Sequence, residues 1–73
     1  MTLQEHITAL EPTAQISLCN GSDWHTEPRS GGKCYNAFFV GAVNDAPAEA
    51  LQRTVTETFT AFMWNTKTFI LKD

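Results

Sequence analysis

The fold predicted for this chain is decided by the stretch Trp24-His-Thr-Glu-Pro-Arg-Ser-Gly-Gly-Lys-Cys-Tyr-Asn-Ala-Phe-Phe-Val-Gly41, which runs into Asp45-Ala-Pro-Ala-Glu-Ala-Leu51. Residues on both sides of the glycine pair have strand-like composition, and the pair itself is a turn signal. The second part has an acidic residue and a proline where a helix begins. We therefore predict two antiparallel strands that lead into an amphipathic helix.

A short helix is predicted at the N-terminus. Thr2-Leu-Gln-Glu5 matches a capping box, in which the threonine hydroxyl accepts a hydrogen bond from the Glu5 amide and the Glu5 carboxylate reaches back. An apolar stripe at helical spacing follows, and Pro12 cannot continue a helix. The predicted helix spans residues 3–10, with the stripe formed by Leu3, Ile7 and Leu10.

A first strand is predicted over residues 13–18, because Ile16 and Leu18 alternate with polar residues. Asn20-Gly21 is a strong turn signal, since both residues tolerate positive φ. A three-residue turn there places Trp24 on the face of Ile16 and Leu18. A two-residue turn would place Asp23 and His25 on that face instead. The apolar pattern favours the three-residue turn.

A second turn is predicted at residues 30–33. Closing it as a four-residue loop pairs Pro28 with Tyr35, Thr26 with Ala37 and Trp24 with Phe39. One face of the third strand then holds Tyr35, Ala37 and Phe39, and the other holds Asn36, Phe38 and Val40.

A second helix is predicted from Asp45 and Pro47 onward. Leu51, Val55, Phe59, Phe62 and Met63 form a helical stripe opposite polar residues. Four threonines weaken the helix propensity, and residues 55–63 also have strand-like features. The stripe and the proline start favour the helix. The end of the chain, residues 66–71, is a possible edge strand.

The predicted fold class is α+β: a single small domain over residues 1–73 in the order α-β-β-β-α. It has a three-stranded antiparallel meander, both helices on one face and a possible C-terminal edge strand. The predicted core consists of Leu3, Ile7, Ile16, Leu18, Trp24, Phe39, Leu51, Val55, Phe59 and Phe62.

Size and charge restrict the function. Seventy-three residues, 42% of them apolar, fit one globular domain near the lower size limit for a self-sufficient core. The net charge of −3 argues against affinity based on phosphate neutralisation. There is no apolar run of membrane-spanning length, and no basic start followed by an apolar run. We expect a cytoplasmic monomer or dimer with no membrane contact and reduced cysteines.

The chemically active residue types lack the spacing that catalysis or metal binding requires. In the predicted meander Cys19 and Cys34 lie ~20 Å apart, too far for a disulfide; a bridge becomes possible only if residues 20–33 form one long loop. The cysteines and histidines form no close ligand pair of the kind that binds zinc. We expect no enzyme activity, no cofactor and no metal.

The candidate binding surface is centred on Phe38 and Val40. They lie on the open face of the predicted sheet beside His25, Glu27 and Asn36, unless the segment around Phe69 and Leu71 covers them. Such an aromatic centre with a polar rim is typical of protein interfaces. Adding the Arg29–Lys33 loop, the corner at residues 64–67 and exposed acidic residues, the candidates are Asp23, His25, Glu27, Arg29, Asn36, Phe38, Val40, Glu49, Glu57 and Trp64.

The predicted element order resembles that of the double-stranded-RNA-binding domain. That family holds phosphates with lysines at the start of its second helix, where this chain has Asp45-Ala-Pro-Ala-Glu49, so no RNA-binding residue carries over. Ala46-Pro-Ala-Glu-Ala-Leu51 after a Phe-rich strand is similar to the strand-to-helix junction of HicB-type antitoxins. In length, charge and lack of catalytic groups the chain resembles the small acidic anti-CRISPR proteins of bacteriophages.

These observations predict a non-enzymatic protein-binding module. Its most specific form is a phage-encoded inhibitor that occludes a host-defence protein or ribonucleoprotein complex, such as a CRISPR effector. Acidic residues would meet basic channels of that complex, including Asp23, Glu27, Asp45, Glu49 and Glu57. The first alternative is direct nucleic-acid binding on the double-stranded-RNA-binding scaffold. The second is an antitoxin-like or structural role with self-association through the C-terminal strand.

Overall fold

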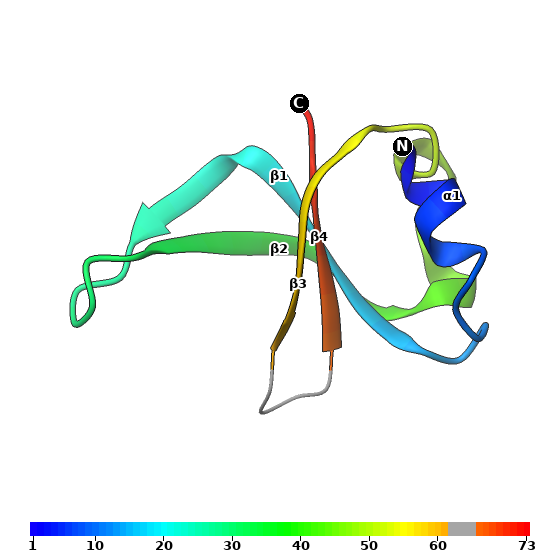
Figure 1. Ribbon diagram of the computed structural model, residues 1–73, viewed down its shortest axis with the longest axis horizontal. Helices are drawn as coiled ribbons and strands as arrows, with labels where there is room; N and C mark the ends of the chain where they lie inside the picture. Colours follow the sequence, from blue (N-terminus) through cyan, green and yellow to red (C-terminus); the bar gives the residue numbers. More distant parts are fainter. Residues whose placement is uncertain (62–65) are drawn as a thin grey trace.

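The computed structural model describes residues 1–61 and 66–73, which form a four-stranded mixed sheet with a short helix against it (Figure 1). The strand order is β2-β1-β4-β3; β1 and β4 are parallel, and the other two pairs are antiparallel. The elements are α1 (Leu3–Ile7), β1 (Gln15–Thr26), β2 (Lys33–Ala42), the 3-10 turns η1 (Val43–Asp45) and η2 (Ala48–Ala50), β3 (Val55–Ala61) and β4 (Thr66–Leu71).

The predicted capping box is confirmed at the start of α1. The Glu5 amide donates to the Thr2 hydroxyl over 3.3 Å, and the Thr2 amide donates to the Glu5 carboxylate over 2.8 Å. The α-helix ends at Ile7 and not at residue 10. A tighter turn follows, in which the Leu10 amide donates to the Ile7 carbonyl before Pro12 stops any continuation.

The turn predicted at Asn20-Gly21 is wrong, because β1 runs through these residues as one strand. On one side, Asn20 pairs with Leu71 of β4. On the other, residues 20–23 all lie opposite Asn36 alone, between the pairs Cys19–Ala37 and Trp24–Tyr35. A Cβ on Gly21 would stand 3.3 Å from the Leu71 carbonyl oxygen. The glycine therefore permits a close approach of two backbones within a wide bulge, a common use of strand glycines.

The second turn is confirmed in place but not in register. Thr26 pairs with Lys33, and the loop between them closes with a 2.7 Å bond from the Glu27 amide to the Gly32 carbonyl. Gly31 has φ 73°, which a side chain would disfavour. Trp24 pairs with Tyr35 and not with Phe39, because the loop comprises residues 27–32 and not 30–33. Residues 23–36, which comprise the end of β1, the loop and the start of β2, extend away from the rest of the molecule, and we call them the arm (Figure 1).

The predicted second helix is wrong. Residues 43–50 form two 3-10 turns, and Val55–Ala61 is a strand, so only α1 covers the sheet as an α-helix among the described residues. The alternating threonines of this segment are β-branched and fit a strand better than a helix. The edge of β4 supplies the pairing partner that makes the strand stable. Phe62 and Met63, the end of the predicted helical stripe, lie outside the described residues.

The possible C-terminal edge strand is confirmed as a strand but lies inside the sheet, between β1 and β3. Phe69, Ile70 and Leu71 are all buried, as in strands that are covered on both faces. Because both edges of β4 are paired, it offers no free edge for the predicted self-association through the C-terminal strand.

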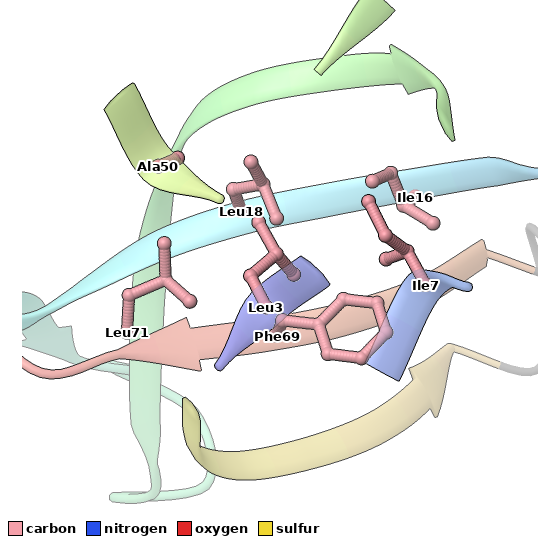
Figure 2. Packing of buried hydrophobic residues seen from close by; sticks show 7 residues of the cluster. All are labelled: Leu3, Ile7, Ile16, Leu18, Ala50, Phe69 and Leu71. Carbon is pink, nitrogen blue, oxygen red and sulfur yellow. The ribbon is translucent and has the colours of Figure 1, made fainter. Parts of the chain in front are cut away.

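The core lies between α1, β1 and β4, where Leu3 and Ile7 meet side chains from both strands (Figure 2). Four predicted core residues are confirmed as buried, and Phe39, Leu51 and Val55 pack partly buried against them. Trp24 and Phe59 are wrong, with exposed fractions of 44% and 46%; Phe62 lies outside the described residues. The buried cluster is Leu3, Ile7, Ile16, Leu18, Ala50, Phe69 and Leu71.

Candidate functional site

One row of cross-strand neighbours runs across all four strands on the sheet face opposite α1. Val40 of β2 pairs with Ser17 of β1, Ser17 with Thr68 of β4, and Thr68 with Phe59 of β3. The two hydroxyls in the middle share a 2.9 Å hydrogen bond, and Thr68 is buried. The two apolar ends are exposed, Val40 at 66%. The row therefore has a satisfied polar centre flanked by accessible apolar side chains.

The next row on the same face is more deeply buried at its centre. Ala37 pairs with Cys19, Cys19 with Ile70, and Ile70 with Glu57. Cys19 and Ile70 have exposed fractions of only 2% and 1%, whereas Glu57 at the β3 end is exposed. The Glu57 carboxylate therefore lies beside the buried residues Cys19 and Ile70, on the same side of the sheet as Phe59.

Phe38 lies beside these rows because β2 is irregular there. Leu18 pairs with Phe39 and the next residue, Cys19, pairs with Ala37, so Phe38 is the extra residue of a bulge. Bulges commonly redirect a side chain. The Phe38 ring is 42% exposed, and its centroid lies 5.8 Å from the Arg53 guanidinium carbon, within the range of a cation–π contact.

Arg53 is held in this position by the C-terminal end of the chain. Its guanidinium donates to the Lys72 carbonyl over 3.0 Å and lies 3.8 Å from the Asp73 carboxylate. We call Phe38, Val40, Glu57 and Phe59 the open face. It has exposed apolar residues on either side of the Ser17–Thr68 hydroxyl pair, one carboxylate from Glu57 and one nearby guanidinium.

Three predicted candidates, Phe38, Val40 and Glu57, belong to the open face, with Val40 and Glu57 on its opposite edge strands, and Phe38 and Val40 are exposed. The alternative in which Phe69 and Leu71 cover them is wrong, because both of these side chains lie in the core. Glu49 is exposed in η2, away from the strands. Trp64 lies outside the described residues.

The remaining candidates lie on the arm and not beside Phe38 and Val40. His25 pairs with Cys34, and Asp23 accepts a 3.0 Å hydrogen bond from the Asn36 side chain. Glu27 and Arg29 belong to the loop at the tip, where the Arg29 amide donates to the Glu27 carboxylate. Because His25 pairs with Cys34, six residues along β2 from Val40, this group lies away from the open face.

Two exposed aromatic residues, Trp24 and Phe59, were predicted to lie in the core and not at a binding surface. Trp24 lies on the arm, with the Lys33 ammonium 4.5 Å from its ring centroid and 5.5 Å from that of Tyr35. Phe59 lies on the open face. The alternation of threonine with Val55, Glu57 and Phe59 is a strand signal that could have identified β3. With β3 recognised, Phe59 would have been placed on a sheet face and not in a helical stripe.

The two thiols are free and lie on adjacent strands. Cys19 faces Ala37, three residues along β2 from Cys34, so the predicted separation of ~20 Å is too large; roughly 10 Å along the strand remains. Burial raises the pKa of the Cys19 thiol, with smaller contributions from Asp23 and Cys34. Cys34 is half-buried. In the described part of the chain, no group of three or more His, Cys, Asp or Glu side chains could hold a metal ion.

A groove of about 330 Å³ lies between α1 and η1, with Ile7, Leu10, Val43 and Leu51 on its walls and Thr8 and Asn44 as polar neighbours. Its lining contains no titratable side chain, so it offers no group for general acid–base catalysis.

The pKa values of two carboxylates elsewhere are lowered by local hydrogen bonds. The bonds from Thr2 lower the pKa of Glu5, and the bond with Ser22 lowers the pKa of Asp73.

The chain matches no protein-family model, and comparisons with curated proteins and with solved structures give no match either. Within residues 1–61 and 66–73, no helix has the length and apolar character needed to cross a bilayer.

Proposed function

We propose that this protein is a non-enzymatic module that binds another protein through the open face. The proposal rests on one observation: Phe38, Val40 and Phe59 present accessible apolar surface on a sheet face that no described α-helix covers. Strands hold these side chains in fixed positions, so little conformational entropy is lost when a partner docks. Exposed large apolar residues that cluster on one face are typical of interaction sites.

The polar centre of the face also favours docking. Burying an unpaired hydroxyl costs free energy, because it loses its hydrogen bond to water. Ser17 and Thr68 share one hydrogen bond, so covering them with an apolar partner surface costs less than covering two unpaired hydroxyls. Each apolar side chain that becomes fully buried contributes about 1.5–3 kcal/mol before the cost of association.

The charge of the chain favours a basic partner. The net charge is −3, and Glu57 is exposed at the margin of the open face. Charge complementarity would mainly raise the association rate and select the partner, while the apolar residues supply affinity. In its most specific form, the proposal is a phage-encoded inhibitor that acts in the host cytoplasm. It would occlude a basic surface of a host-defence protein or ribonucleoprotein, such as a CRISPR effector.

An affinity experiment with paired variants tests this proposal. Tagged wild-type protein, Phe59→Asp, Val40→Asp and the control Thr60→Asp are incubated with host extract. Thr60 is exposed on the same strand as Phe59 but points to the other face. We expect one stoichiometric protein with wild type and with Thr60→Asp, and at least tenfold less of it with either open-face variant.

Two results would contradict the proposal. One is the absence of any stoichiometric protein partner. The other is a partner retained by both open-face variants. Recovery of nucleic acid that is released steeply by salt would instead favour the alternative of direct nucleic-acid binding.

A further inference from the structure

We propose that the outer edge of β2 pairs antiparallel with the same edge of a second copy of this chain, so that two four-stranded sheets join into one continuous mixed sheet of a symmetric dimer. The paired segment is centred on Val40. This inference goes beyond the proposed function, since it concerns the edge of the sheet and a second copy of the chain.

The direction of the backbone groups of β2 follows from its pairing with β1. The Val43 amide donates to the Ala14 carbonyl over 3.0 Å. Hydrogen-bonded pairs alternate along an antiparallel ladder, so Gly41 and Phe39 also direct their backbone groups toward β1, in register with residues 16 and 18. The N–H and C=O of Val40 and Ala42 therefore point outward. Because β2 is the first strand of the sheet, no further strand meets them in the described part of the chain.

The two edges of the sheet differ in how well they resist pairing. The β3 edge carries the exposed Glu57 and an irregularity between Val55 and Glu57. Charges and bulges of this kind keep edge strands from joining. The β2 segment 38–42, Phe-Phe-Val-Gly-Ala, contains no charge and no proline. Its bulge lies at Phe38, at the far end from Ala42, which leaves the stretch around Val40 regular and unprotected.

A second copy fits this edge without conflict. A two-fold axis normal to the sheet at Val40 places Val40 opposite its own copy and Phe39 opposite Gly41 of the partner, with antiparallel strands. No like charges face each other, because the segment carries none. The outward N–H and C=O of each Val40 meet those of the other, which satisfies groups that no strand of the described residues pairs in the monomer.

The symmetry also keeps both open faces on the same side of the joined sheet. The exposed Val40 and Phe38 side chains of the two copies would then form one continuous apolar strip. A short strand edge buries less surface than the ~1,200 Å² of a stable interface. We therefore expect a dimer that forms with increasing concentration and not a permanent one.

Sedimentation equilibrium of the purified chain, from ~10 µM to ~1 mM, tests the inference in the weak-interface range. Wild type should rise from the 8.1 kDa of one chain toward twice that mass. Val40→Pro removes the outward amide and Val40→Lys places two like charges at the axis, so both should stay at one chain mass. Val40→Thr keeps the shape and should behave as wild type.

Hydrogen exchange gives the second readout: the Val40 amide should become protected as the concentration rises, while the Gly41 amide is protected throughout.

If circular dichroism shows that Val40→Pro is unfolded, the mass of Val40→Lys alone tests whether the β2 edge forms the dimer. A wild-type mass of one chain at every concentration would overturn the inference, and so would dimers that persist in Val40→Lys. Phe59→Asp leaves the β2 edge intact and should still dimerise even where it loses a protein partner, so this inference and the proposed function can fail separately.

Discussion

The hydroxyl oxygens of Ser17 and Thr68 lie 2.9 Å apart across the parallel pair of β1 and β4, although 51 positions separate them in the chain. This hydrogen bond links the two strands at the middle of the face opposite α1, between Val40 and Phe59. It adds to the backbone ladder between β1 and β4, the pairing through which β4 joins β3 to the rest of the structure.

Removing either hydroxyl should therefore lower the free energy of unfolding. We expect Ser17→Ala and Thr68→Val each to cost about 1 kcal/mol, because the remaining hydroxyl loses its partner in a part-buried site. The double variant should cost less than the sum, as for residues in direct contact. Urea denaturation measures all three. Thr58→Val, at an exposed β3 position, is the control and should stay within about 0.5 kcal/mol of wild type; additive costs for the pair would contradict the bond.

Two phenylalanines with opposite environments give a direct test of the fold. Phe69 is fully buried in the core, whereas Phe59 is 46% exposed. We expect Phe69→Ala to cost about 3–5 kcal/mol through lost burial and the cavity left behind, which in a domain of this size could abolish folding. Phe59→Ala should cost ~1 kcal/mol or less. Thermal unfolding followed by circular dichroism compares the two, and similar losses of stability would show that β3 and β4 are wrongly placed.

The two cysteines should differ in reactivity. Cys19 has an exposed fraction of 2%, and burial raises the pKa of its thiol, so little reactive thiolate forms at neutral pH. Cys34 is half-buried. We expect one fast-reacting thiol per chain with an aromatic disulfide reagent, and a second only when the protein unfolds.

The variant Cys34→Ser assigns the fast phase: it should eliminate that phase, while Cys19→Ser retains it. Fast reaction of both thiols in the folded wild-type protein would show that the centre of the sheet is open to solvent.

The capping box should make stability depend on pH in the acidic range. Hydrogen bonds from Thr2 lower the folded-state pKa of Glu5 below its unfolded value. A lowered carboxyl pKa contributes stability that is present above the unfolded pKa and is lost as pH falls through the folded pKa. We expect the melting temperature to fall between about pH 5 and pH 3, and part of this fall to disappear in Glu5→Gln.

Asp73 contributes in the same direction, since the hydrogen bond with Ser22 and the nearby Arg53 lower its pKa. The control is therefore Thr2→Ala, which removes the hydrogen bonds of the Thr2 hydroxyl with Glu5, keeps the bond from the Thr2 amide and leaves Asp73 unchanged. It should reduce the pH dependence in the same direction as Glu5→Gln but by less, because the amide bond to the Glu5 carboxylate remains. An NMR titration in which the Glu5 pKa is the same in wild type and in Thr2→Ala would contradict the assignment.

Local signals in the sequence were interpreted correctly where the interactions themselves are local. The capping box of Thr2 and Glu5 and the hairpin loop around Gly31 both form within a few residues, so the pattern predicts the structure. The turn predicted at Asn20-Gly21 is wrong, because β4 pairs with β1 through these residues and overrides their turn propensity. Sequence reasoning failed again at residues 55–61, where the periodicity allowed a helix or a strand and the edge of β4 decided for the strand.

For the candidate site too, neighbours along one strand were predicted better than neighbours on different strands. Val40 and Phe38 were predicted to share a face from the alternation along one strand, and both are exposed, although the bulge at Phe38 interrupts that alternation. Their neighbours were predicted wrongly, since those depend on register between strands. The loop closes at Thr26 and Lys33, which pairs His25 with Cys34, far along β2 from Val40, and β3 brings Phe59 to the face of Val40.

The amino-acid sequence by itself determined a small α+β chain with a capped N-terminal helix, a hairpin at the glycine pair and a strand at the C-terminus. Each of these depends on the conformational preferences of neighbouring residues. Only the tertiary structure decided that the C-terminal strand lies inside the sheet, parallel to β1, with Phe69 in the core and Phe59 exposed. The physical reason is that strand order and register are set by hydrogen bonds and burial between residues far apart in the chain, which no local pattern specifies.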